Sequence, residues 1–217
     1  MTRWAPVRSD TIAALADEIL HNYAKGRVMV AIDGIDGAGK TRFADDLAAA
    51  IAATGHAAAR ATIDDFHAPR AVRYARGQDS PEGFYLDSYD YAGFRSALVA
   101  PFKAGEDFST GVFDHLSDTA APRHPQSAPA DTIMVVDGIF LNRPELRGIW
   151  NYSVWLDVPT EIGQDRVRGR AVDNGTGPRY TGGQELYIAE AGPRLRAVAI
   201  IDNTDFDHPR RVFADSC

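Results

Sequence analysis

The sequence contains almost no cysteine: the only one, Cys217, is the last residue of the 217-residue chain. A single cysteine excludes a disulfide within the chain and a cysteine-based metal site. Long apolar runs are missing too, since no stretch approaches the roughly 20 residues of a transmembrane helix. The first 20 residues lack the continuous apolar segment of a signal peptide. We therefore expect a cytoplasmic protein in a reducing compartment, with no membrane partner.

Basic residues are fewer than acidic ones, and lysine is rare. The chain has 23 Lys and Arg against 30 Asp and Glu, a net charge of −7, and only three of the basic residues are lysines. This balance disfavours a broad nucleic-acid surface, so we expect no nucleic-acid partner, although a local basic cluster is compatible with binding a small anion. The hydrophobic content of 45% fits a single domain over residues 1–217, which would bury about 70% of its unfolded surface.

A glycine-rich stretch, AIDGIDGAGKTRF at residues 31–43, is the most specific motif in the sequence. Gly34, Gly39, Lys40 and Thr41 fit the pattern G-x-x-x-x-G-K-[ST], in which a loop wraps a phosphate too closely for most side chains. An apolar run at 28–32 precedes the motif, and an amphipathic helix pattern follows it. This context predicts a phosphate-binding loop, or P-loop, before a helix whose positive end faces the anion.

The same motif predicts the nucleotide and the metal ion. In such loops Lys40 would reach the β- and γ-phosphates, and the Thr41 hydroxyl would bind Mg²⁺. We therefore expect ATP and Mg²⁺. The loop residues expected to contact the nucleotide are Gly34, Asp36, Gly37, Ala38, Gly39, Lys40, Thr41 and Arg42.

Apolar strands alternate with helical patterns along the rest of the chain. Strands are expected at 28–32, 57–64, 133–136, 152–158 and 197–202. This alternation predicts an α/β fold of the P-loop NTPase type, with a doubly wound parallel sheet covered by helices on both faces. Proline- and glycine-rich stretches predict a mobile acceptor-side loop at 67–88, an irregular insertion at 101–130 with a small hairpin near 108–113, and a hinge or flap at 173–183.

Acidic residues end several of these strands, where ligands of doubly wound sheets gather. Asp137 follows an apolar strand and matches the Walker B position, so we expect it to act with Thr41 at the Mg²⁺ site. Phosphoryl transfer also needs a carboxylate near the acceptor hydroxyl. Asp64 is our preferred base and a further metal-ligand candidate. Asp65 remains an alternative, because adjacent side chains on a strand point to opposite faces.

Arginines form two patterns. Arg166 and Arg170 share a helix face four residues apart, beside the glycine-rich flap, and predict a lid over residues 166–183 that stabilises charge on the transferring phosphoryl group. Arg70, Arg73 and Arg76 recur every third residue in the predicted mobile loop. They would recognise an anionic acceptor or form a solvated loop, and the sequence does not decide between these roles.

Several segments together resemble the uridine kinase and phosphoribulokinase group of P-loop kinases, with bacterial uridine kinase-like proteins as the best match. In chain order they are GIDGAGKT, IDDFH, DSPEGFYLDSYDY, VVDGIFL, the Arg166/Arg170 helix and AVAIIDNTD. The resemblance covers nearly the whole chain. It implies a five-stranded parallel core, ATP and Mg²⁺, Asp64 as the base, a lid carrying Arg166 and Arg170, and an adenine site near Asn203 and Thr204.

The acceptor segments depart from this family pattern. Uridine–cytidine kinases hold ribose with an aspartate-rich DHPD stretch, where this sequence has FYLD and retains only Asp87. They read the pyrimidine with a tyrosine and a histidine, where GVFDHLSD offers Phe113 and Asp118. Losing these hydrogen-bonding groups removes the means of recognising a base. The sequence therefore predicts a kinase more firmly than it predicts uridine as the acceptor.

We conclude from the sequence that the protein transfers the γ-phosphoryl group of ATP to a hydroxyl of a small-molecule acceptor, in the manner of a uridine or nucleoside kinase. One alternative is a non-nucleoside acceptor, such as a sugar, a sugar phosphate or a pantothenate-like compound. Another is a nucleotide-binding regulatory switch with slow hydrolysis, although the chain has no N-K-x-D guanine-reading motif. A homo-oligomer is expected by analogy alone.

Overall fold

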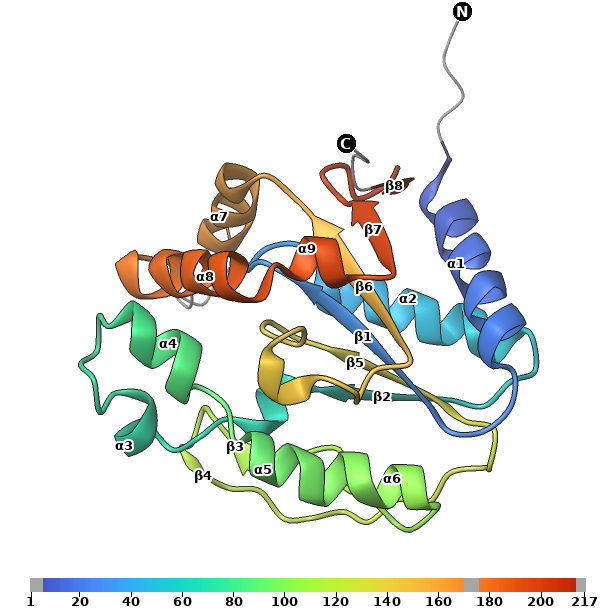
Figure 1. Cartoon of the computed structure of the whole chain (residues 1–217), viewed down its shortest axis with the longest axis horizontal. Coiled ribbons are helices and arrows are strands. Elements are labelled where there is room, and N and C mark those ends of the chain that lie inside the picture. The colour runs from blue at the N-terminus through green and yellow to red at the C-terminus, as the bar shows by residue number, and fades with distance from the viewer. Residues whose placement is uncertain (1–5, 170–175, 214–217) are drawn as a thin grey trace, which may run out of the picture.

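A computed structural model describes residues 6–169 and 176–213 of the chain. Its central sheet has six strands in the order β2-β5-β1-β6-β7-β8 (Figure 1). These strands are Ala58–Thr62 (β2), Ile133–Asp137 (β5), Val28–Gly34 (β1), Tyr152–Asp157 (β6), Ala199–Asp202 (β7) and Arg210–Val212 (β8). The first five are parallel, and β8 pairs antiparallel with β7. The predicted α/β fold is confirmed, and β8 adds a strand that was not predicted.

The apolar composition of the central strands explains their position. Every residue of β1 and β5 is buried, as expected for parallel strands covered on both faces. Ile32 in β1 and Thr62 in β2 both pair with Asp137 in β5. The register therefore brings the carboxyl ends of these three strands to one edge of the sheet.

Helices lie on both sides of the sheet (Figure 1). The two long N-terminal helices, Arg8–Tyr23 (α1) and Lys40–Ala53 (α2), pack against each other. The remaining α-helices are Arg70–Arg73 (α3), Pro81–Asp87 (α4), Tyr91–Phe94 (α5), Ala100–Ala104 (α6), Thr160–Arg168 (α7), Pro178–Ala191 (α8) and Pro193–Arg196 (α9). Among the described residues, no helix combines the length and apolar character needed to cross a membrane.

The segment at 67–88, predicted to be a mobile loop, instead contains the two helices α3 and α4. Ser80 caps α4 by accepting a hydrogen bond from the Gly83 amide at 3.0 Å, and Pro81 occupies the first turn. Phe84 and Tyr85 in this helix are buried. The prediction gave too much weight to proline and glycine, which here serve as helix-start residues.

The glycine-rich segment at 173–183 also differs from the predicted hinge, because α8 already begins at Pro178. A Cβ atom at Gly182 would lie 2.8 Å from Cγ of Pro81, and one at Gly183 would lie 2.6 Å from Cδ1 of Phe84. These glycines therefore allow α8 to pack closely on α4, as Figure 1 shows. Residues 170–175, including Arg170, lie outside the described part.

The irregular insertion at 101–130 carries its hairpin later than predicted. Strands Phe113–Asp114 (β3) and Thr119–Ala120 (β4) pair antiparallel. The segment 114–118 of this hairpin lies close to α3. The Asp118 carboxylate there accepts a hydrogen bond from the Arg70 amide at 2.8 Å.

Candidate active site

The P-loop joins β1 to α2 and depends on two glycines in left-handed conformations. Gly37 has φ +78° and Gly39 has φ +88°. A Cβ at residue 37 would overlap the carbonyl oxygen of Gly163 in α7, and one at residue 39 would lie 2.6 Å from the Phe206 ring. Both conformation and space therefore require glycine at these two positions.

The Lys40 ammonium is held inside this loop. Its Nζ donates a hydrogen bond to the Ile35 carbonyl at 2.9 Å and lies 3.8 Å from the Asp36 carboxylate. The Asp36 amide donates to Oε1 of Gln184 in α8 at 2.9 Å. Ala38 is fully buried, and its amide bonds to the Ile35 carbonyl at 3.1 Å. The loop thus surrounds the Lys40 ammonium and is also hydrogen-bonded to α8.

Thr41 and Asp137 form the second part of the site. The Thr41 hydroxyl donates to Oδ2 of Asp137 at 2.7 Å, and Arg60 in β2 donates to Oδ1 at 2.8 Å. Oxygen ligands are those that Mg²⁺ prefers, and it usually keeps several waters and binds substrate phosphates as well. The hydroxyl and carboxylate beside the P-loop fit a Mg²⁺ ion bound in this way. No group of three or more His, Cys, Asp or Glu side chains in the described ranges is arranged as a metal site on its own.

Asp64 and Asp65 face different cavities. Asp64 lines the cavity that contains Lys40, Thr41 and Asp137, whereas Asp65 lines a neighbouring one beside the β3–β4 hairpin. The two residues lie in a short 3-10 helix, Ile63–Phe66, that follows β2. This turn separates their side chains, and the geometry favours Asp64 as the group that meets a substrate at the P-loop.

Tyr89 orients the side chain of Asp64, and His67 contacts its main chain. The hydroxyl of Tyr89 donates to its Oδ1 at 2.9 Å, and the Asp64 carbonyl is 2.7 Å from Nδ1 of His67. Burial, followed by the charge of Asp64, raises the pKa of Tyr89 well above its ordinary value. Tyr89 therefore remains a hydrogen-bond donor to the carboxylate throughout the neutral pH range.

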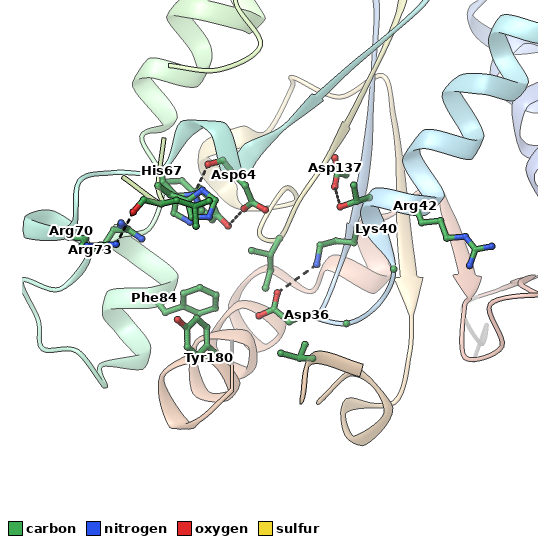
Figure 2. A pocket seen from close by; sticks show the side chains of 18 of the residues that line it. Asp36, Lys40, Arg42, Asp64, His67, Arg70, Arg73, Phe84, Asp137 and Tyr180 are labelled. Atoms are coloured by element: carbon green, nitrogen blue, oxygen red, sulfur yellow. Dashed lines mark hydrogen bonds and ion pairs between the residues drawn. The ribbon is translucent and has the colours of Figure 1, made fainter. Parts of the chain in front are cut away.

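The main cavity has a volume of about 540 Å³. In Figure 2, Lys40 and Asp137 lie at one side, Arg70 and Arg73 lie at the other, and Asp64 lies between them. One end therefore carries the predicted phosphate-binding groups, and the opposite end is available to a second substrate. Arg42 also lines the cavity, but its side chain points away from Lys40 in Figure 2.

Arg166 has a different environment from the one predicted. It donates to the Gly37 carbonyl at 3.2 Å and to the Thr204 carbonyl at 2.7 Å, and its guanidinium carbon is 3.6 Å from the centre of the Phe206 ring. Burial lowers the pKa of Arg166. In this structure Arg166 thus supports the P-loop and the segment after β7 rather than facing the cavity.

Asn203, predicted near adenine, supports the same side of the P-loop. Its side chain is fully buried and donates to the Ala38 carbonyl at 2.7 Å, while its Oδ1 has no partner among the described residues. Thr204 contributes its carbonyl to Arg166. Both residues lie behind the loop that would hold the phosphates.

Two supporting residues were not identified from the sequence. Arg60 lies in a strand of small residues, and a charged residue in such a strand is a signal that a buried partner, here Asp137, lies nearby. Gln184 lies in α8 just beyond the segment 173–183 that was predicted to be a hinge or flap, and no sequence pattern marks its contact with the P-loop.

No protein-family model matches the chain, and no curated protein matches its sequence. Solved structures do match it. A candidate uridine kinase from Bacillus stearothermophilus is 27% identical over 89% of this chain and 98% of that chain, with a TM-score of 0.73. The chain has a uridine kinase-like P-loop kinase fold.

Other solved structures share this P-loop kinase fold but differ in the substrates that their names give. A candidate fructose transport system kinase from a Silicibacter species is 27% identical over 86% of this chain and 95% of that chain, with a TM-score of 0.65. D-glycerate 3-kinase from Cryptococcus neoformans is 11% identical over 86% of this chain and 87% of that chain, with a TM-score of 0.51, and shows the fold alone. The shared fold therefore does not identify the acceptor.

Proposed function

We propose that the protein is an ATP-dependent kinase that phosphorylates a hydroxyl group of a small molecule. The observation that carries this proposal is that Asp64 faces the same cavity as Lys40 and the Thr41–Asp137 pair. A base, a phosphate-binding lysine and a magnesium site are the three elements that in-line phosphoryl transfer requires.

In the proposed reaction the acceptor oxygen forms a bond to the γ-phosphorus, and the bond from that phosphorus to the β,γ-bridging oxygen breaks. The products are ADP and a phosphate ester. Asp64, oriented by Tyr89, accepts the proton of the acceptor hydroxyl. Lys40 stabilises charge on the phosphate oxygens. Mg²⁺, when bound beside Thr41 and Asp137, neutralises further phosphate charge.

The proposal also concerns the chemical class of the acceptor, which is either a nucleoside or a non-nucleoside compound. The likeness to a candidate uridine kinase favours a nucleoside. However, Asp87, the one acid retained from the ribose-binding stretch, forms an ion pair with Arg76 at 2.8 Å, and Asp118 accepts hydrogen bonds from Arg70 and Arg73. These contacts favour the alternative of a non-nucleoside acceptor.

The test is ADP release from Mg·ATP in the presence of uridine, cytidine, pantothenate, ribulose 5-phosphate and simple sugars, with the Lys40→Ala variant as the control. Stimulation by any compound that Lys40→Ala abolishes supports a kinase and identifies the acceptor class. If ATP binds, and neither these compounds nor a wider set of hydroxyl acceptors raises ADP release, the kinase proposal fails in favour of a regulatory nucleotide-binding protein.

A further inference from the structure

The end of the main cavity opposite the P-loop is built around two arginines of α3. Arg70 and Arg73 both line the cavity. Arg70 is exposed, its guanidinium donates to the Leu116 carbonyl at 3.2 Å, and no carboxylate of the described residues lies within ion-pair distance of it. Its positive charge therefore remains available to a ligand.

Arg73 is a buried cation with unused hydrogen-bonding capacity. The residue is only 8% exposed. It forms an ion pair with Asp118 at 3.2 Å, yet its Nε is buried with no partner. A buried donor without a partner costs stability unless a ligand or a water fills the role. This end of the cavity thus contains two cations and one paired carboxylate, together with a donor that lacks an acceptor.

The surrounding residues fix this group in place. Arg179 in α8 is itself buried, and it donates to the carbonyls of Arg73 at 2.9 Å and Ser80 at 3.1 Å. The rings of His67 and His115 stack with centroids 4.9 Å apart and line the cavity between α3 and Asp64. Contacts of this kind hold the binding groups in place before a ligand arrives, which lowers the entropic cost of binding.

Given the proposed kinase function, on which this inference rests, we propose that the acceptor is an anionic hydroxy compound. Its carboxylate or phosphate binds Arg70 and Arg73, and its hydroxyl faces Asp64. Guanidinium groups recognise such planar or tetrahedral anions with paired, charge-assisted hydrogen bonds. A neutral nucleoside would leave Arg70 without a partner of opposite charge, and it would offer Arg73 no negative charge beyond that of Asp118.

The test measures binding rather than turnover. Calorimetry on the Mg·ADP complex compares glycerate, a carboxylate, and glycerol 3-phosphate, a phosphate ester, with neutral glycerol. We expect at least one anion to bind more tightly than glycerol, and Arg70→Gln to weaken that binding by roughly ten- to a hundred-fold, because a hydrogen bond to a charged group is lost. Arg73→Gln should do the same, and Arg73→Lys should restore part of the affinity. The anion that binds distinguishes a carboxylate site from a phosphate site.

Arg76→Gln is the matched control, because Arg76 lies three residues beyond Arg73 but pairs with Asp87. It should leave anion binding unchanged. Equal affinity for the anions and glycerol, or equal losses in Arg70→Gln and Arg76→Gln, would overturn the proposal. Because Arg73 is buried, the binding data of its variants are used only if those variants fold. If they do not fold, the exposed residue Arg70 provides the test through Arg70→Gln alone.

The same titrations separate the two proposals. If Mg·ADP binds and the anions do not, the kinase proposal stands and the anionic acceptor fails. If Mg·ADP does not bind, the kinase proposal fails, and an Arg70-dependent anion site would survive as a separate finding.

Discussion

At the scale of single residues, the most decisive feature is the placement of two adjacent acids in different cavities. Asp64 faces the P-loop, whereas Asp65 faces the hairpin, where Val112 bonds to its carbonyl at 3.0 Å. The sequence could identify the pair but not choose between its members on strand geometry, because the chain leaves the strand at Thr62 and enters a 3-10 turn.

The first prediction uses this pair as its own control. Asp64→Asn should lower kcat by roughly a hundred- to ten-thousand-fold, the usual contribution of a general base, while ATP still binds. Asp65→Asn should retain most activity. Steady-state kinetics with the acceptor found in the ADP-release assay provides the measurement, and a larger loss in Asp65→Asn than in Asp64→Asn would reverse the assignment.

Asp65 also carries a prediction about pH. Burial, and then the Asp64 charge, raises the pKa of Asp65 in the folded chain. A carboxyl group with a raised folded pKa makes stability fall as pH rises from its unfolded pKa through its folded pKa. Asp65→Asn should therefore unfold at a higher urea concentration than wild type at pH 7, with the difference disappearing near pH 3. An unchanged difference between these two pH values would contradict the assigned shift.

Arg60 gives a prediction about the magnesium site. Its ion pair compensates the nearly buried Asp137 carboxylate, so Arg60→Met should lower stability by about 3 kcal/mol. Because a bound cation compensates the same charge, Mg·ATP should raise the melting temperature more in this variant than in wild type. Arg8→Met is the control, since Arg8 pairs instead with Asp46 of α2 at 2.6 Å. Equal responses to Mg·ATP in the two variants would count against this role.

Among the helices and strands, the sequence best predicted those whose own residues show a complete apolar pattern. Strands β1 and β5 were predicted because their residues are all apolar up to the terminal polar residues. Helix α4 and the start of α8 were missed, because each is stabilised mainly by the other. Gly182 and Gly183 meet Pro81 and Phe84 across this contact, and no local pattern distinguishes a packing glycine from a hinge glycine.

A similar close contact joins α7 to the P-loop and can be tested. A Cβ at Gly163 would lie 2.6 Å from the Asp36 carbonyl oxygen, so Gly163→Ala should displace α7 or the loop and cost about 1–3 kcal/mol of stability. ATP affinity should fall with it. Gly169→Ala is a matched control, because a Cβ there meets its nearest atom at an ordinary 3.5 Å. Calorimetry and urea unfolding compare the two variants, and tolerance of Gly163→Ala would contradict the tight contact.

At the scale of the whole molecule, the candidate site depends on contacts between segments that are distant in sequence. The P-loop and the residues at the ends of β2 and β5 could be predicted, because each stands at a strand end of a recognisable sheet. The roles of Arg166 and Arg73 could not, because they depend on which carbonyls and carboxylates the folded chain brings near them. The buried Asp33 carboxylate illustrates this dependence, since it accepts hydrogen bonds from the Gly34 amide at 2.8 Å, from the Asn142 side chain at 2.7 Å, and from the Tyr187 hydroxyl.

Asp33 therefore connects β1, the segment after β5 and α8 at one buried point, and burial raises its pKa. Tyr187→Phe removes the hydroxyl that donates to Asp33 and accepts from the Asn142 amide at 2.9 Å, with little change in the volume of the core. It should therefore lower the free energy of unfolding by about 1–3 kcal/mol. Tyr23→Phe is the control, because the Tyr23 hydroxyl has no hydrogen-bond partner among the described residues. Urea unfolding measures both variants. A loss in Tyr187→Phe no greater than in Tyr23→Phe would mean that the hydrogen bond to Asp33 does not help to hold α8, leaving its packing on α4 and contacts such as that of Gln184 with the P-loop to position it.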